Sequence, residues 1–420
     1  MDTIIGSSYY TKLKKKQERQ ADVFIIFLLL DVLEVIFTFL CGKIIDESFA
    51  TLLFDIIRGG FAAYLVGVLL KYRKNFFKFI LVCITLVVLY VTSIMVNQEL
   101  LEVMNRTLIV GFFGTWLPAI ALGMLLRENR KNFWERLLKY LPIIYIYIGV
   151  VLLSFDMAYI YQNVAYNILI FAIAVIEVWF EKKKPSHIIN AILLAGLLFF
   201  TGARGPLLSF VLFAVWRFWQ FSRKIKGWRY LIIILILLVV ILLTIFPDAL
   251  NMILSTIFPN SRIVDMLVSG SFFVSGRSSI YNYCIEELWS RWFTFGGMMS
   301  DRFFLTNTFM NTNLLGFWIV DKSAYNSVYA HNLFIELCFC FGTFWGLVFS
   351  AVLTWKIIKQ FRRSKSHEKN MLVILICIGF VPLLFTSSLW ASTYFWILLG
   401  FMLSSKKKQI QRSNSIYFQQ

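Results

Sequence analysis

Long runs of apolar residues, separated by short polar segments, fill most of the 420-residue chain. Each run is unbroken, whereas the strands of a membrane barrel alternate apolar and polar positions. A helical run of about 20 apolar residues matches the thickness of a bilayer. The pattern predicts an all-α integral membrane protein with about 12 transmembrane helices, at residues 22–40, 48–70, 76–96, 107–126, 140–155, 161–180, 187–200, 206–221, 230–246, 331–354, 371–387 and 389–404.

The composition agrees with a membrane protein. Hydrophobic residues make up 59% of the chain and charged residues 15%, and the mean hydropathy is +0.73. Soluble domains carry roughly a quarter charged residues. The net charge of +18 raises the possibility of nucleic-acid binding. However, lysine and arginine gather in short clusters between the apolar runs, which is the pattern that sets membrane topology, so we expect no nucleic-acid partner.

The basic clusters predict the orientation of the chain. Most of its 41 lysines and arginines lie in alternate connecting segments, namely the N-terminal tail, Lys71–Lys78, Arg127–Lys139, Lys182–Lys184, Arg217–Arg229, Lys356–Lys369 and the C-terminal tail. Such segments stay in the cytoplasm, so we expect both termini there. The longest polar segment, 247–330, then forms one large extracytoplasmic loop between spans 9 and 10. We expect residues 1–246 to hold the first nine helices, and 331–420 the last three with the tail.

Arg204 is one of the few basic residues on the outward side. It lies between Gly202 and Gly205, just before Pro206. The glycines allow a tight turn, and proline suits the first turn of a following helix, whose N-terminus attracts anions. This arrangement indicates an anion site, although an arginine that reaches the lipid headgroups would look the same. The seventh and eighth spans could also form one broken helix interrupted at Gly202–Pro206.

The large loop and its end hold the other candidate residues. Arg277 follows Gly276 among serines, a setting that suits an anionic ligand, because guanidinium binds phosphate oxygens in pairs. Arg291 is a weaker candidate because it lies between Trp289 and Trp292 and can pack against them. Tyr281 is one of several loop aromatics that can stack on sugars. His331, at the end of the loop, can act as a general base near neutral pH.

Several classes of chemistry lack support in the sequence. There is no phosphate-binding P-loop, no dinucleotide fingerprint and no G-x-S-x-G elbow. The three histidines are dispersed without metal-ligand spacing, so we expect no metal and no cofactor. Five charged residues fall inside predicted spans and could line a path or pair with each other: Asp31, Glu34, Asp55, Arg58 and Glu177.

Taken in order, these segments resemble the superfamily of O-antigen polymerases (Wzy-type) and O-antigen ligases. The matching residues are Thr201-Gly202-Ala203-Arg204-Gly205-Pro206, then Gly276-Arg277, then Gly296-Gly297, and finally His331-Asn332-Leu333-Phe334 with Gly342 and Gly346. The resemblance covers roughly residues 190–350. Ala203 stands where the family has serine, and Gly296 and Gly297 are adjacent where the family separates its glycines by one residue.

The resemblance implies a bacterial glycosyltransferase of the cytoplasmic (inner) membrane that polymerises O-antigen or capsular polysaccharide. It would move a growing glycan from undecaprenyl diphosphate onto the next lipid-linked repeat unit at the outer face. Arg204 and Arg277 would stabilise the leaving diphosphate, and His331 would serve the attacking hydroxyl. Arg291, Gly276, Asn332 and Tyr281 would complete the substrate site. Membrane lipids, a chain-length regulator and a flippase would be its partners.

Three alternatives stay open at this point. A ligase, which attaches the finished glycan to a lipid or protein acceptor, would share the same motifs. Another class of membrane glycosyltransferase uses acidic residues in the first outer loop, where Asp46 and Glu47 lie. A lipid-linked oligosaccharide flippase is the third, but transporters usually show internal repeats, and none is evident.

Overall fold

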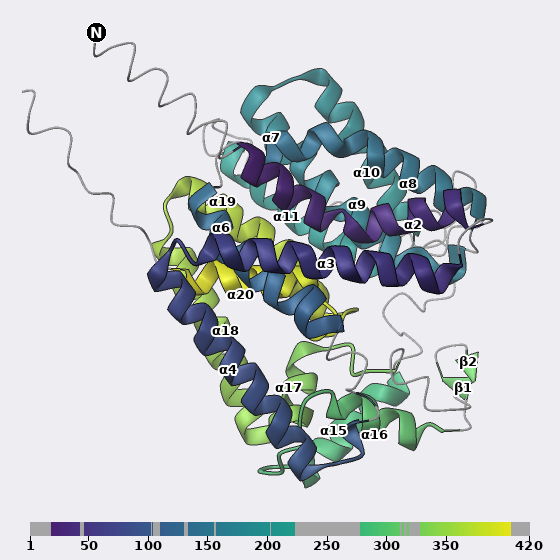
Figure 1. Cartoon of the computed structure of the whole chain (residues 1–420), viewed down its shortest axis with the longest axis vertical. Helices are drawn as coiled ribbons and strands as arrows, with labels where there is room; N and C mark the ends of the chain where they lie inside the picture. Colours follow the sequence, from purple (N-terminus) through teal and green to yellow (C-terminus); the bar gives the residue numbers. More distant parts are fainter. Residues whose placement is uncertain are drawn as a thin grey trace, which may run out of the picture.

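The computed structural model describes residues 18–42, 46–101, 103, 110–129, 133–154, 157–201, 203–222, 278–310, 313–314, 317–318 and 328–404. Within this part of the chain the secondary structure is almost entirely helical (Figure 1). A bundle formed by the N-terminal half and the C-terminal helices occupies the upper part of the figure. A smaller group, α15, α16 and α17, lies below it, and α4 and α18 extend from the bundle toward that group.

The first half of the chain supplies the outer and central helices of the bundle. After a helix over Glu18–Leu28 come α2 (Leu30–Cys41), α3 (Glu47–Leu69) and α4 (Arg73–Val96). The π-helical segment η1 (Val110–Trp116) continues into α6 (Leu117–Asn129). Then follow α7 (Phe133–Leu137), the 3₁₀ turn η2 (Leu138–Tyr140), α8 (Leu141–Ser154), α9 (Met157–Lys182), α10 (Pro185–Thr201) and α11 (Arg204–Ser222).

The second half supplies the smaller group and returns to the bundle. It contains α15 (Ser278–Ser290), α16 (Ser300–Thr308), β1 (Asn313–Leu314), β2 (Phe317–Trp318), α17 (Leu333–Phe341) and α18 (Thr343–Arg363). After these come α19 (Ser366–Leu375), the π-helical η4 (Ile376–Phe380), the 3₁₀ turn η5 (Val381–Leu384) and α20 (Thr393–Leu403). β1 and β2, with two residues each, form a short antiparallel pair, and the described structure is otherwise helical, as the apolar pattern predicts.

The described residues contain six helical segments that are long and apolar enough to cross a membrane. They are Ser48–Leu69, Arg73–Val96, Val110–Arg127, Phe133–Leu153, Gln162–Lys182 and Ser366–Leu384. A seventh is possible if Glu18–Leu28 and Leu30–Cys41, which meet at 59°, count as one span. These segments fit a polytopic membrane protein. The total of about 12 stays a prediction, and the span expected at 230–246 lies outside the described residues.

The single helix expected over 331–354 is wrong. Gly342 adopts a left-handed φ of +82° and divides this apolar run into α17 and α18. A Cβ atom at Gly346 would overlap the backbone of Cys338, so α18 packs backbone to backbone against α17. With nine residues, α17 is roughly 14 Å long, too short to cross a bilayer. Hydropathy alone could not reveal this break, because both halves of the run are apolar.

The α10–α11 connection reverses the direction of the chain. The start of α10 and the later part of α11 lie near the Lys182 end of α9, since Pro185 follows that end closely and Arg217 pairs with Glu177. Thr201 instead lies beside Val164, near the Gln162 end. The two helices therefore form an antiparallel hairpin around the turn that contains Arg204. This excludes the alternative of one broken helix.

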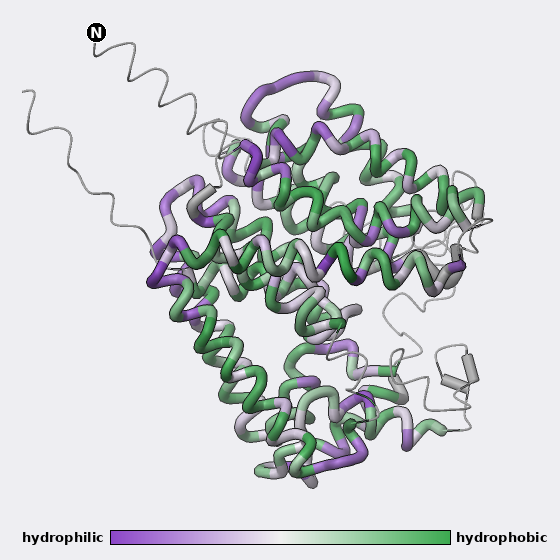
Figure 2. Tube along the Cα trace, viewed as in Figure 1, coloured by the Kyte–Doolittle hydropathy of each residue, from purple (hydrophilic) through white to green (hydrophobic). Residues whose placement is uncertain are grey.

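The predicted basic segments meet at one end of the bundle, which we call the Lys182 end. Ion pairs join them there: Arg127 with Glu368, Arg136 with Asp22, Lys182 with Glu135 and Arg217 with Glu177. Figure 2 shows hydrophilic residues concentrated at the helix ends of this part of the bundle, whereas hydrophobic residues follow the helices themselves. This clustering on one side is the arrangement that the charge pattern predicts.

The centre of the bundle depends on close contact between α6 and α20. A Cβ atom at Gly123 would overlap the carbonyl oxygen of Ile397, and one at Gly400 would overlap the carbonyl oxygen of Ile120. Small residues allow two helix backbones to approach in this way inside a membrane. Trp116 packs beside the same helix, with its ring centroid 5.5 Å from that of Trp396.

We expect Gly123→Ala to destabilise the protein by about 1–3 kcal/mol, because the added methyl group would push α6 away from α20. Thermal unfolding in detergent measures the effect. The control is Gly149→Ala in α8, where no atom lies within 4 Å of the new Cβ. That change replaces glycine by a better helix former and should be neutral or stabilising. Equal melting temperatures for the two variants would contradict this account of α6–α20 packing.

Candidate functional site

His331 lies at the end of the connection that leads into α17, and its side chain is 4% exposed. Its backbone has a left-handed φ of +53°. For a residue other than glycine this conformation costs about 1–2 kcal/mol, and such strain is concentrated at functional sites. The imidazole ring packs against the ring of Tyr329, with 3.8 Å between the centroids. The fold therefore fixes His331 in one unusual conformation.

Asn332 fixes the start of α17. Its Oδ1 accepts hydrogen bonds from the backbone N–H groups of Phe334 (3.0 Å) and Ile335 (3.3 Å), which is an N-cap interaction. Its Nδ2 donates to the carbonyl oxygen of Leu384 in η5 (3.1 Å). Asn332 thus connects α17 to the end of η5, directly beside His331. Its predicted contact with substrate stays a prediction.

The segment after η5, Thr386–Leu389, links the bundle to the smaller helical group. We call it the Thr386–Leu389 loop. The carbonyl oxygen of Thr386 accepts hydrogen bonds from Gln162 Nε2 (2.5 Å) and from the Tyr329 hydroxyl (3.0 Å). The Thr386 side chain also bonds to the hydroxyl of Tyr166 on α9. Through Thr386, α9 is connected to the residue that packs on His331.

The turn that contains Arg204 meets the same loop. Gly205 lies so close to Thr386 that a Cβ atom there would overlap the threonine hydroxyl. The backbone of Arg204, the first residue of α11, is therefore adjacent to a residue that binds Tyr329. Two of the three residues that the sequence singles out, Arg204 and His331, thus belong to one neighbourhood. The third, Arg277, and Gly276 beside it lie outside the described residues.

A cluster of buried charged side chains lies next to the segment that contains His331. Asp301 and Arg302, from α16, are 0% and 4% exposed, and Glu336, from α17, is 1% exposed. Arg302 Nη2 donates to Ser388 Oγ (3.2 Å), and Ser388 Oγ donates to Glu336 Oε1 (2.6 Å). The backbone N–H of Leu389 donates to Glu336 Oε2 (2.8 Å). We call these residues, Asp301, Arg302, Glu336 and Ser388, the buried charge cluster.

Asp301 joins this cluster to His331. The backbone N–H of Ala330 donates to Asp301 Oδ2 at 3.0 Å. Burial raises the pKa of the Asp301 carboxyl, and the Arg302 guanidinium and backbone hydrogen bonds act in the opposite direction. The net shift is upward.

Sequence reasoning missed most of this cluster. It passed over Asp301 and Glu336. One signal was available for Glu336, because it is the only acidic residue in the apolar run 331–354, and an isolated charge in such a run is usually functional. Nothing comparable marks Asp301, whose burial depends on how α16 packs.

The paired glycines of the resemblance hold α17 at its other end. The backbone N–H groups of Gly296 and Gly297 both donate to the carbonyl oxygen of Cys340, at 3.1 and 3.0 Å. A helix ends with unsatisfied carbonyl groups, and these two donors satisfy one of them. Gly297 has a φ of +90°, which other residues rarely adopt. The Gly-Gly pair therefore supports the helix that begins at His331.

Two other predicted substrate residues are described. The Arg291 Nε lies 2.6 Å from Glu287 Oε1, and its guanidinium lies 3.7 Å from the ring centroid of Phe304. Arg291 thus packs against an aromatic ring, as the alternative interpretation foresaw, although the ring is not that of Trp289 or Trp292. Tyr281 is half-buried in α15. Their roles in substrate binding stay predictions.

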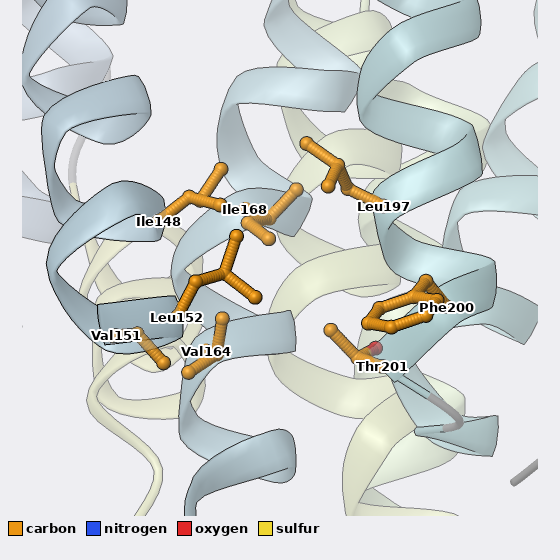
Figure 3. Close-up of a pocket in the computed structure, with 8 residues that line it drawn as sticks. All are labelled: Ile148, Val151, Leu152, Val164, Ile168, Leu197, Phe200 and Thr201. Atoms are coloured by element: carbon orange, nitrogen blue, oxygen red, sulfur yellow. The ribbon is translucent and has the colours of Figure 1, made fainter. Parts of the chain in front are cut away.

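An apolar groove opens between α8, α9 and α10 (Figure 3), with a volume of about 290 Å³. Its lining is entirely hydrocarbon except for Thr201 at one end, and consists of Ile148, Val151, Leu152, Val164, Ile168, Leu197, Phe200 and Thr201. Thr201 ends α10 immediately before the turn that contains Arg204. The groove therefore runs toward the candidate site. In the part of the chain that the structure describes, no group of three His, Cys, Asp or Glu side chains is arranged to hold a metal.

These features define a class of protein, a polytopic helical membrane protein with a polar site enclosed where its helix ends meet. Residues 189–351 match the family model described as O-antigen ligase. This segment contains Arg204, Asp301, His331 and Glu336, and the match supports the resemblance to the O-antigen ligase and polymerase superfamily. Its members are glycosyltransferase-like enzymes that act on lipid-linked O-antigen glycans. No curated protein and no solved structure matches the chain.

We expect Asn332→Ala to lower stability by about 0.5–2 kcal/mol, because α17 loses its N-cap. Asn332→Ser should fall between wild type and Asn332→Ala. Serine keeps a cap acceptor but cannot reach the Leu384 carbonyl. Thermal unfolding in detergent compares the three proteins, and a serine variant no more stable than the alanine variant would contradict the capping role.

Proposed function

We propose that the protein is a polysaccharide polymerase of a bacterial cytoplasmic membrane. It transfers a growing O-antigen or capsular glycan from undecaprenyl diphosphate onto a lipid-linked repeat unit. The observation that carries this proposal is that Thr386 lies against the Arg204 turn and also binds Tyr329, whose ring packs on His331. An anion-binding turn and a general base are the two parts that such a transfer needs. The family match to residues 189–351 supports the same class of reaction.

The transfer follows from the roles of these residues. The acceptor hydroxyl oxygen forms a new bond to the anomeric carbon while the bond from that carbon to the diphosphate breaks. The electron pair of the broken bond stays on the diphosphate oxygen, where Arg204 and Arg277 stabilise the charge. His331 accepts the proton of the attacking hydroxyl. A single displacement of this kind inverts the anomeric centre, and it requires neither a metal nor another cofactor.

The groove between α8, α9 and α10 suits the carrier lipid. Its surface is apolar, and it ends at Thr201 beside the turn that would bind the diphosphate. An isoprenoid chain in the groove would place its diphosphate at that turn. The lipid would remain in contact with the bilayer, since Leu152 and Phe200 on the groove wall are 54% and 42% exposed.

The orientation follows from the charge distribution. The basic segments gather at the Lys182 end, and the candidate site lies at the Gln162 end of α9. If basic segments stay in the cytoplasm, the site faces outward and both termini lie inside. A flippase that delivers the lipid-linked unit to the outer face and a chain-length regulator are the partners that we propose.

A ligase is the second candidate function, and the description of the matching family favours it. The two reactions share a donor and differ in acceptor. Purified protein supplied with lipid-linked repeat units alone separates them. Long glycan chains support the polymerase. No product until a separate lipid or protein acceptor is added supports the ligase, and movement of the intact substrate across vesicles without product supports a flippase.

Substitution of the proposed site residues tests the chemistry. We expect His331→Ala to reduce kcat by about 10²–10⁴-fold through loss of the general base. Arg204→Ala and Arg277→Ala should each reduce it by about 10²–10³-fold. His187→Ala is the matched control, because His187 lies near the start of α10 at the Lys182 end. If Asp46→Asn and Glu47→Gln abolish activity while His331→Ala does not, the alternative class of glycosyltransferase is correct.

The groove has its own test. We expect Leu197→Trp to fill part of the groove and to raise the KM for a long-chain lipid donor several-fold, with little change in kcat. A donor with a short isoprenoid chain should be affected less, because it occupies less of the groove. The control is Ile192→Trp on the same helix, where Ile192 is 68% exposed and outside the groove. Equal KM values for Leu197→Trp and Ile192→Trp would exclude the groove as the lipid site.

A further inference from the structure

We propose that the buried charge cluster positions His331 for the transfer reaction, so that Asp301, Arg302, Glu336 and Ser388 are positioning residues. Asp301, Glu336 and Ser388 are at most 1% exposed, less than His331 itself at 4%, and all four residues of the cluster bond to groups of the protein. They therefore act through the residues that they hold. This inference rests on the proposed function and adds residues to it. Ser388 also lies beyond the segment 189–351, so the family match does not point to it.

Two members of the cluster contact the immediate neighbours of His331. The Asp301 carboxylate accepts a hydrogen bond from the backbone N–H of Ala330, the residue before His331. The Arg302 guanidinium lies 5.3 Å from the ring centroid of Tyr329, and that ring packs against His331. The cluster thus holds His331 through the backbone of Ala330 and through the Tyr329 ring that packs on the imidazole.

The unusual backbone of His331 needs such support. A left-handed φ in a residue with a Cβ persists only where the surrounding structure overdetermines it. Asp301 binds the backbone N–H of Ala330, the residue before His331, and the Asn332 cap fixes the residue after it. Asp301 and Asn332 thus hold the backbone on both sides of His331. Loss of either contact lets the His331 imidazole move.

Ser388 and Glu336 hold the Thr386–Leu389 loop. Ser388 Oγ accepts from Arg302 and donates to Glu336, so it joins α16 to α17. Glu336 also binds the backbone N–H of Leu389. The Thr386–Leu389 loop is therefore held at Ser388 and Leu389, while Thr386 contacts Gly205 and Tyr329. The cluster sets the distance between the Arg204 turn and His331.

The cost of burial supports a role beyond stability. Moving a charged group out of water is expensive even when it is paired, and apolar side chains of the same size often stabilise a protein more. Three buried ionisable groups placed together in the first turns of α16 and α17 are thus a poor means of stabilising these helices. They hold the groups that they bind in a fixed orientation, because hydrogen bonds to charged groups are short and directional.

The test uses the full-length protein in detergent with lipid-linked repeat units as substrate. We expect Asp301→Ala to reduce kcat by about 10²-fold, the cost of moving a catalytic group by about 1 Å, with KM changed less than twofold. Asp301→Asn keeps an oxygen that accepts from Ala330 and should recover most of the rate. Ser388→Ala should reduce kcat to a smaller extent, because it breaks the link between α16 and α17 without removing a charge.

Glu177→Gln is the matched control. Glu177 is also buried, at 2% exposure, and pairs with Arg217. It lies eleven residues along α9 from Tyr166, or roughly 16 Å from the site. We expect it to lower thermal stability without changing kcat. If Asp301→Ala does not fold, Ser388→Ala decides the question. Wild-type kcat in folded Asp301→Ala, or in folded Ser388→Ala, would overturn the proposal. A wild-type protein without transferase activity would instead overturn the proposed function.

Discussion

The arrangement of the candidate site depends on one short segment, the Thr386–Leu389 loop. Thr386 bonds to α9 and Tyr329 and lies against Gly205, whereas Ser388 and Leu389 bond to Glu336. Polar groups that are removed from water must be satisfied by neighbours. Here the neighbours come from both parts of the molecule, so satisfying the loop also brings the Arg204 turn to the histidine. The bundle and the smaller helical group thereby form one site.

The parts of this fold that follow from local physical rules could be predicted from the sequence. Bilayer thickness marks the apolar runs, and the charge pattern marks which connecting segments share a face, which the ion pairs at the Lys182 end bear out. The break at Gly342 could not be predicted in this way, because glycine is common inside membrane helices and only a left-handed φ makes it a break. The same limit applies to Asp301, whose burial is a property of tertiary packing.

The family resemblance and the structure contribute different information about the motif residues. The resemblance singled out Gly296 and Gly297 without giving them a role, and it implied that Asn332 belongs to the substrate site. The contacts show that all three hold α17 at its ends. Several motif positions thus maintain the helix that follows His331. The position of Arg277 relative to His331 lies outside the described residues.

The left-handed backbone of His331 limits which side chains can replace it. Glycine adopts this conformation without strain, and asparagine and aspartate adopt it more readily than other residues, whereas alanine does not. A glycine at this position would keep the chain path and leave a space beside Tyr329 of the size of an imidazole ring. Free imidazole, supplied from solution, could occupy that space and accept a proton. The backbone conformation therefore makes this histidine suited to chemical rescue.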